Sequence, residues 1–166
     1  MYVLDYHRQL ALIKEMVQLR KDDEKWEAYY HHPSTNEMWK SFFPQANGEK
    51  RGPKVMRIEP VPEKLEERLD VCLKSDNKDD ARGLGVELSV DLHKWDHVLG
   101  IIEKQYREYE RSQLQIFLSE IGIREYEKTF KNLGYEFQDF GFDEKQLKSM
   151  VWRIRKVLFK KRIIFW

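Results

Sequence analysis

Apolar side chains near the start of the chain recur at the spacing of a helix. They are Tyr6, Leu10, Ile13 and Val17. Steps of four, three and four residues place all of them on one helical face. A charged run follows at residues 21–25. The pattern therefore predicts a first helix that begins at residue 6 and closes at this run.

The next residues have a mixed pattern. Residues 26–32 are rich in aromatic side chains and precede Pro33, and a residue before proline avoids the helical conformation. This stretch predicts a short extended segment. Ser34 and Glu37 have the spacing of a capping box, which predicts a short helix that ends before Pro44. Its apolar face would carry Met38, Trp39, Phe42 and Phe43.

A loop and a strand are predicted before the next helix. Residues 45–53 contain two glycines and an asparagine and have no periodicity, which predicts a surface loop or a recognition loop. Charged and apolar residues alternate over residues 54–59, a pattern typical of one strand. Two prolines at residues 60–62 suit the first turn of a helix. The apolar face of that helix would consist of Leu65, Leu69, Cys72 and Leu73.

A further helix is predicted over residues 81–88, with Asp79 or Asp80 at its cap. A glycine inside a helix costs about 1 kcal/mol relative to alanine. We therefore interpret Gly83 and Gly85 as residues that permit close packing of helices.

Apolar residues alternate in steps of three and four over residues 91–112, which predicts one long helix. Residues 112–166 predict short helices broken at glycines, followed by a last helix. The glycines are Gly122, Gly134 and Gly141, and the last helix carries Leu147, Met150, Val151, Ile154 and Leu158.

Together these elements predict a mostly α protein, a helical bundle with at most a small β element in its N-terminal half. We place a soft boundary near residue 111. The predicted domains are residues 1–111, which include a short β and loop segment at 26–59, and residues 112–166, a small helical bundle.

Composition limits the function classes. The 166 residues include 30 Lys or Arg and 29 Asp or Glu, so the chain has no global charge for coating a polyanion. Aromatic residues make up 13% and supply the burial that disordered chains lack. Cys72 is the single cysteine, so no internal disulfide forms. Without a secretory signal pattern, or an apolar run near the roughly 20 residues of a membrane helix, we expect a cytoplasmic protein.

Candidate metal and nucleophile positions are few. His93 and His97 are four residues apart, within reach of one metal ion, but no third ligand is near in the sequence. Two surface histidines are the preferred interpretation. The adjacent His31 and His32 are weaker metal candidates, because neighbouring side chains of an extended segment point to opposite faces. Cys72 lies on an apolar helical face and is expected to be a buried, inert thiol. We predict no metal and no cofactor.

The acidic residues and the known catalytic motifs do not indicate a metal site or an active site. A cluster of three aspartates lacks the spacing of a calcium loop, so a solvated loop between helices is expected. These residues are Asp76, Asp79 and Asp80. The chain has no phosphate-binding glycine loop and no Gly-x-Ser-x-Gly motif. We therefore expect no enzyme, and a dispersed site assembled from distant residues is the alternative.

Two groups of residues are candidates for binding a partner. Tryptophan, tyrosine and arginine dominate protein interfaces, and the N-terminal half is rich in aromatic residues. Core packing competes with this function for the same rings. The candidates are Trp26, Tyr30, Trp39, Phe42, Phe43 and Arg51.

The second group is basic and lies in the last helix, among Trp152, Phe159, Phe165 and Trp166. It could contact phosphates, an anionic membrane or an acidic partner, and the alternative is an ordinary solvated helix face. The basic residues are Arg153, Arg155, Lys156, Lys160, Lys161 and Arg162.

The C-terminal third resembles the sterile alpha motif (SAM) domain. The resemblance covers about fifty residues, and it departs where Met150 runs into Val151 without the family's Gly-Ile turn. It implies a small helical bundle that binds proteins, and sometimes RNA. The matching positions are Phe117, Leu118, Ile121, Gly122, Ile123, Tyr126, Phe130, Gly134 and Leu147.

The N-terminal part resembles the small immunity proteins that neutralise bacterial toxins, through residues 30–39 and 51–54. With the lack of catalytic motifs, this resemblance predicts a non-catalytic protein that forms a stoichiometric complex with another protein, as a toxin-neutralising immunity protein or an adaptor. The alternatives are an RNA-binding or membrane-surface module that uses the basic helix, and an enzyme with a dispersed site.

Overall fold

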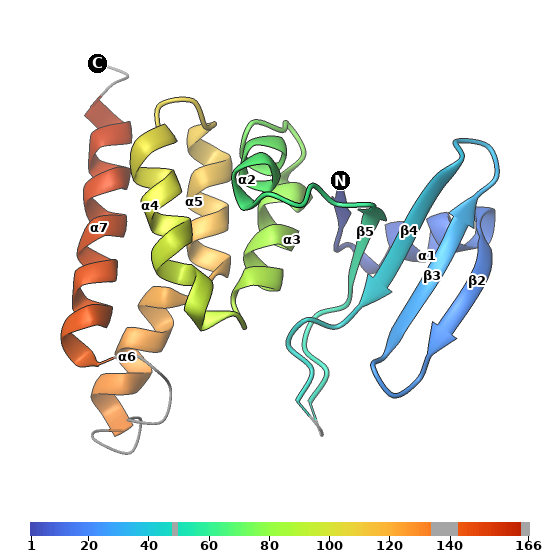
Figure 1. Cartoon of the computed structure of the whole chain (residues 1–166), viewed down its shortest axis with the longest axis horizontal. Coiled ribbons are helices and arrows are strands. Elements are labelled where there is room, and N and C mark those ends of the chain that lie inside the picture. The colour runs from blue at the N-terminus through green and yellow to red at the C-terminus, as the bar shows by residue number, and fades with distance from the viewer. Residues whose placement is uncertain (48–49, 134–142, 164–166) are drawn as a thin grey trace.

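The structure is a computed structural model that describes residues 1–47, 50–133 and 143–163. A five-stranded antiparallel sheet forms the N-terminal part, and a group of helices forms the rest (Figure 1). The prediction of a mostly α bundle with at most a small β element is therefore wrong, and the chain is a mixed α/β protein.

The sheet has the strand order β1-β5-β4-β3-β2. Each neighbouring pair is antiparallel, and β2 and β3, and likewise β3 and β4, are joined by short turns. The strands are β1 (Tyr2–Val3), β2 (Val17–Asp22), β3 (Glu27–His32), β4 (Glu37–Phe42) and β5 (Val55–Glu59). The extended segments predicted at 26–32 and 54–59 are thus confirmed.

The predicted helix after Ser34 is strand β4 instead. Residues before β4 form a turn in which Asn36 has a φ of 58°. In the sheet, Trp39 pairs with Tyr30 on one side and Ile58 on the other. These cross-strand neighbours outweigh the local capping signal, because side-chain pairs across strands stabilise a sheet.

Helix α1 (Tyr6–Glu15) is shorter than predicted. Asp5 caps it by accepting a hydrogen bond from the Arg8 backbone N–H at 2.8 Å. Val17, predicted as its last apolar position, begins β2 and is 53% exposed. The helix covers one face of the sheet and forms a small core there. This core contains Val3, Ala28, Tyr30, Trp39 and Met56, with Leu12, Ile13, Met16 and Ile58 packed against it.

On the opposite face of the sheet, cations and rings alternate across four strands. Arg20 and Lys40 lie 5.2 and 5.4 Å from the centre of the Tyr29 ring. Lys40 and Arg57 lie 5.1 and 4.9 Å from the centre of the Phe42 ring. Cation–π contacts of this kind stabilise partly exposed surfaces by about 0.5–1 kcal/mol each.

The helices after the sheet are α2 (Leu65–Leu73), α3 (Lys78–Leu88), a 3-10 turn (Leu92–Lys94), α4 (Trp95–Gln105), α5 (Arg111–Glu120), α6 (Ile123–Leu133) and α7 (Glu144–Ile163). The long helix predicted at 91–112 is broken. Tyr106 and Tyr109 point into the core from the α4–α5 turn, and the Glu110 backbone N–H bonds to the Leu73 carbonyl at 3.0 Å. Burial of both rings is thus achieved without a continuous helix.

Helix α3 lies between the N-terminal strand β1 and helix α5. A Cβ atom at Gly83 would lie 2.5 Å from the Tyr2 ring. A Cβ atom at Gly85 would lie 2.7 Å from the Cβ of Glu120 on α5. Gly85 therefore permits the close helix packing that the sequence predicts, whereas Gly83 makes room for a ring from strand β1.

The main hydrophobic core extends from Tyr2 and Val55 in the sheet to Val157 in α7. It crosses residue 111, the predicted boundary between 1–111 and 112–166. Gly122, with a φ of 78°, separates α5 from α6, as predicted. Across the described part of the chain, no helix combines the length and apolar character required to cross a bilayer.

Candidate functional site

The β2–β3 turn and the β4–β5 connection lie at the same end of the sheet (Figure 1). Trp26, the last residue of the turn, has a backbone φ of 56°, a value that residues other than glycine rarely adopt. Its indole contacts the Phe43 ring edge to face, with ring centroids 6.1 Å apart. The guanidinium carbon of Arg51 lies 4.2 Å from the centre of the indole ring. An aromatic and cationic cluster thus joins the two loops.

This cluster borders an open cavity of about 430 Å³. Ligand sites in proteins commonly have about 300–1,000 Å³. The lining combines aromatic rings with charges of both signs. It consists of Lys21, Asp22, Asp23, Trp26, Glu27, Ala28, Tyr30, Ser41, Phe43, Arg51 and Lys54.

Carboxylates in the lining already have cationic partners. Glu27 lies 2.6 Å from the Lys40 ammonium and accepts a hydrogen bond from the Tyr29 hydroxyl at 2.9 Å. Burial raises the pKa of Glu27, but hydrogen bonds from Lys40 and Tyr29 outweigh burial and hold that pKa below its ordinary value. Asp23 lies 2.5 Å from the Lys21 ammonium. A general base works best when its pKa is near the operating pH. The lowered pKa of Glu27 is therefore unfavourable for a general base.

Two cations of the lining differ from the carboxylates in their ion pairing. Neither Arg51 nor Lys54 forms an ion pair with another described residue. Burial lowers the pKa of the Lys54 ammonium. Partly removing a charge from water costs free energy unless a partner replaces the water. An acidic group entering this cavity would supply that partner.

The structure brings together four of the six predicted aromatic and arginine residues. Trp26, Tyr30, Phe43 and Arg51 line the same cavity. The other two are elsewhere. Trp39 is 7% exposed in the core beneath α1, and Phe42 is 8% exposed in the main core.

Sequence reasoning missed Lys54 as a lining residue, because it also begins the alternating pattern of β5. The available signal was its place directly after residues 45–53, which the sequence predicts as a surface loop or a recognition loop. Lys54 also fixes the position of this connection, since its carbonyl accepts a hydrogen bond from the buried Gln9 side chain at 3.0 Å.

The predicted basic group divides into two sets. Arg153 forms ion pairs with Asp96 and Glu103, at 2.5 and 2.9 Å, and so joins α7 to α4. Lys161 is buried and donates a hydrogen bond to the Arg107 carbonyl. These two cations have structural roles. The remaining four, Arg155, Lys156, Lys160 and Arg162, are exposed.

The histidine candidates do not converge. His93 lies in the 3-10 turn, and His97 lies in α4 with its Nε2 atom 3.6 Å from a carboxylate oxygen of Glu66. His31 bonds to the Asn36 side chain at 3.0 Å. Throughout the described ranges, no group of three or more His, Cys, Asp or Glu side chains is placed to hold a metal ion.

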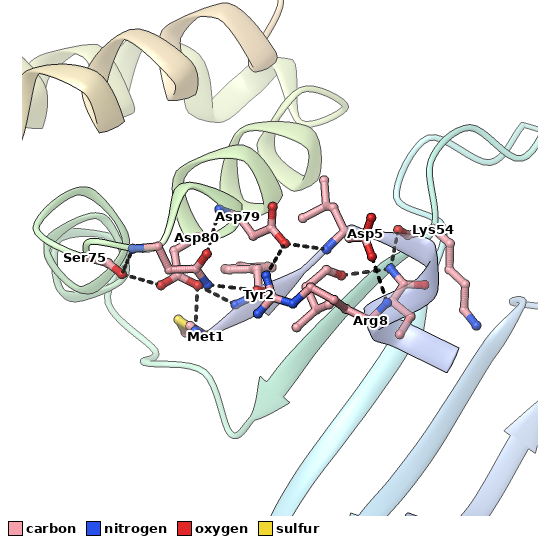
Figure 2. A network of polar contacts seen from close by, with 12 residues as sticks. Met1, Tyr2, Asp5, Arg8, Lys54, Ser75, Asp79 and Asp80 are labelled. Carbon is pink, nitrogen blue, oxygen red and sulfur yellow. Dashed lines mark hydrogen bonds and ion pairs between the residues drawn. The ribbon is translucent and has the colours of Figure 1, made fainter. Parts of the chain in front are cut away.

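The aspartates after α2 are a correction to the solvated loop that the sequence predicts. Asp80 is 4% exposed and lies 2.6 Å from both the Met1 amino nitrogen and the Tyr2 backbone nitrogen (Figure 2). The Ser75 hydroxyl donates to its other oxygen at 2.6 Å. Asp79 accepts from the Leu4 backbone N–H at 3.2 Å. Asp79 and Asp80 therefore anchor β1 to α3, which explains why their side chains turn inward.

Cys72 is fully buried in α2, as predicted, and burial raises the pKa of its thiol to about 12. Since the thiolate is the reactive form, we expect alkylation by iodoacetamide at about pH 8 to be roughly a thousandfold slower in the native protein than in urea. Mass spectrometry of timed samples measures both rates. Equal rates would contradict an inert thiol.

The residues that carry the SAM resemblance contribute to the helical core where they are described. Five of them are almost fully buried: Phe117, Leu118, Ile121, Ile123 and Leu147. The predictions that involve Gly134, Gly141, Phe165 and Trp166, and the side chain of Phe130, lie outside the described part of the structure.

The comparisons with family models, with curated proteins and with solved structures each give no match.

Proposed function

We propose that this chain is a non-catalytic protein-binding protein that forms a stoichiometric complex at the end of its sheet. The observation that carries the proposal is the Arg51 guanidinium stacked on Trp26 beside the open cavity. We name Trp26, Phe43, Arg51 and Lys54 the sheet-end cluster. The resemblance to toxin-neutralising immunity proteins adds support, and an adaptor would act in the same way.

The chemistry of the sheet-end cluster favours a protein surface as its ligand. Binding hot spots are enriched in tryptophan, tyrosine and arginine and are surrounded by polar residues that exclude water. Here Trp26 and Phe43 form a half-buried centre, with exposed Lys21 and Asp23 at the margin. The positive φ of Trp26 adds support, since strained backbone conformations gather at functional sites.

The charges indicate what the partner presents. The lining carboxylates Glu27 and Asp23 are paired, whereas Arg51 and Lys54 have no ionic partner among the described residues. We infer that the partner inserts an acidic side chain next to an apolar one. The free, buried thiol of Cys72 is consistent with a cytoplasmic complex.

The test compares the wild type, two variants of the cluster and a control variant as baits in the native host extract, followed by titration of the captured partner. Trp26→Gly removes the indole at a backbone conformation that glycine adopts without strain. Arg51→Glu reverses a charge that has no ionic partner in the described part of the chain. Each variant is expected to weaken binding by about thirtyfold or more, as loss of a hot-spot residue does. Wild-type affinity is expected to fall as salt rises.

Lys25→Glu is the matched control, because it reverses an exposed charge in the same turn but outside the cavity lining. It should bind like the wild type. Circular dichroism melting establishes that each variant is folded. If folded Trp26→Gly and Arg51→Glu proteins both keep wild-type affinity for the captured partner, the sheet-end cluster is not the binding site.

A further inference from the structure

The outer face of α7 carries an exposed apolar stripe. Trp152, Phe159 and Ile163 are 59%, 63% and 53% exposed. They are separated by seven and four residues, so at about 100° per residue they fall within about 40° of the helix circumference. The opposite face, which includes Ile154 and Val157, is buried in the core. The helix is thus held in place while its stripe faces outward.

Four cations flank the stripe on both sides. By the same rotation of about 100° per residue, Arg155 and Arg162 lie on one side of it and Lys156 and Lys160 on the other. Within the described ranges, none of the four forms an ion pair. Lys156 instead lies 4.8 Å from the centre of the Trp152 ring.

Charge is concentrated in this helix. It contains eight Lys or Arg residues and one Glu, although the whole chain has a formal charge of +1. Its acidic residue, Glu144, lies at the first turn and pairs with Lys148 at 2.5 Å. From Lys145 to Ile163 the helix has no acidic side chain. The exposed half of α7 is therefore complementary to an anionic surface.

We propose that the outer face of α7 binds the surface of an anionic lipid membrane. A helix that lies in a membrane interface places apolar and aromatic side chains at the boundary of the acyl chains and keeps Lys and Arg beside the headgroups. The stripe and its two flanking rows have this arrangement. Nucleic acid fits less well, because a phosphate backbone would meet Trp152, Phe159 and the aliphatic Ile163 where it needs cations.

This surface is distinct from the sheet-end cluster and does not depend on the proposed partner. Figure 1 shows α7 and the β2–β3 turn at opposite ends of the molecule. The two sites can therefore be tested separately in the same full-length chain.

The experiment is sedimentation with sucrose-loaded vesicles of phosphatidylcholine alone, or with one third of it replaced by phosphatidylserine. The wild type is expected to bind the anionic vesicles in low salt and to dissociate as salt rises. Two charge reversals, Arg155→Glu with Lys160→Glu, should weaken binding by at least about tenfold. Trp152→Ala with Phe159→Ala should weaken it by a similar factor, because the apolar contact is lost.

Matched controls separate these effects from total charge and total aromatic content. Lys78→Glu with Lys104→Glu makes the same charge change on exposed positions of α3 and α4, and Tyr6→Ala removes a ring that is 62% exposed on α1. Both controls should bind vesicles like the wild type. No sedimentation with anionic vesicles in low salt, or equal binding by the α7 variants, would overturn the proposal. Tighter binding to a short RNA than to vesicles would overturn it too.

Discussion

Replacement of Glu87 by alanine is expected to lower the free energy of unfolding by about 3–5 kcal/mol, because it leaves two mostly buried arginines without their shared carboxylate. Glu87 on α3 accepts hydrogen bonds from Arg57 on β5, from Arg68 on α2 at 2.7 Å and from the Tyr2 hydroxyl at 2.8 Å. One carboxylate thus joins two strands to two helices. Urea unfolding followed by circular dichroism measures the loss.

Glu108→Ala is the control for this substitution. Glu108 pairs with Lys74 at 2.9 Å, but its side chain is 60% exposed, and exposed ion pairs contribute about 0–1 kcal/mol. If Glu87→Ala costs no more than Glu108→Ala, the Glu87 carboxylate does not hold the sheet to the helices.

The same carboxylate is expected to make stability depend on pH. Burial raises the pKa of Glu87, but the hydrogen bond and charge of Arg57, together with the charge of Arg68, outweigh burial and lower that pKa from 4.5. A lowered pKa contributes stability above pH 4.5, which is lost as the pH falls through the folded-state value. The difference in unfolding free energy between the wild type and Glu87→Gln should therefore be largest near neutral pH and shrink in acid. A constant difference across the titration would contradict this linkage.

Most helices that follow the sheet could be predicted from the sequence because their signals are local, although the long helix predicted over residues 91–112 is broken. Leu69, Cys72 and Leu73 share one face of α2 and are fully buried. Gly83 and Gly85 marked close contacts correctly, although the elements that approach them, β1 and α5, are distant in the sequence. Local periodicity gives the face that is buried, but it does not identify what covers that face.

The sheet was underestimated for the opposite reason. Trp39 follows a capping-box pattern that favours a helix, whereas its partners Tyr30 and Ile58 are brought alongside by the chain's two turns. Val17 continues the apolar stripe of α1 but begins the edge strand β2. Strand pairing depends on non-local contacts, so a single sequence shows it weakly.

Only part of the candidate site could be predicted, because it too depends on contacts between residues distant in the sequence. Aromatic abundance identified Trp26 and Phe43 correctly as residues at one cavity, yet it included Trp39 as well. The difference between them is the position of α1, which covers Trp39 and leaves the sheet end open. Lys54 could be recognised as a cation of the cavity, with no ion pair to any residue that the structure describes, once the loops were placed in space.

Substitution of Gly83 by alanine is expected to destabilise the fold by about 3 kcal/mol, the upper part of the range for overpacked cores. The new Cβ would lie 2.5 Å from Cγ and Cδ1 of Tyr2 and 2.6 Å from its Cβ. The Tyr2 side chain is fully buried, and its hydroxyl is held by Glu87 and Arg68. Because the ring cannot turn away without breaking those bonds, α3 must shift from β1. Urea denaturation at fixed temperature measures the effect.

A second glycine and a double variant make this prediction specific. Gly100 lies within α4, and a Cβ there would have its nearest neighbour, an Arg153 nitrogen, at 4.0 Å. Gly100→Ala is therefore expected to stabilise the protein by about 0.5–1 kcal/mol, through helix propensity alone. Tyr2→Gly removes both the ring and the Cβ atom that Gly83→Ala meets, so the double variant should lose less stability than the sum of the two single losses. Additive losses would show that the contact between α3 and the Tyr2 ring does not limit the size of residue 83.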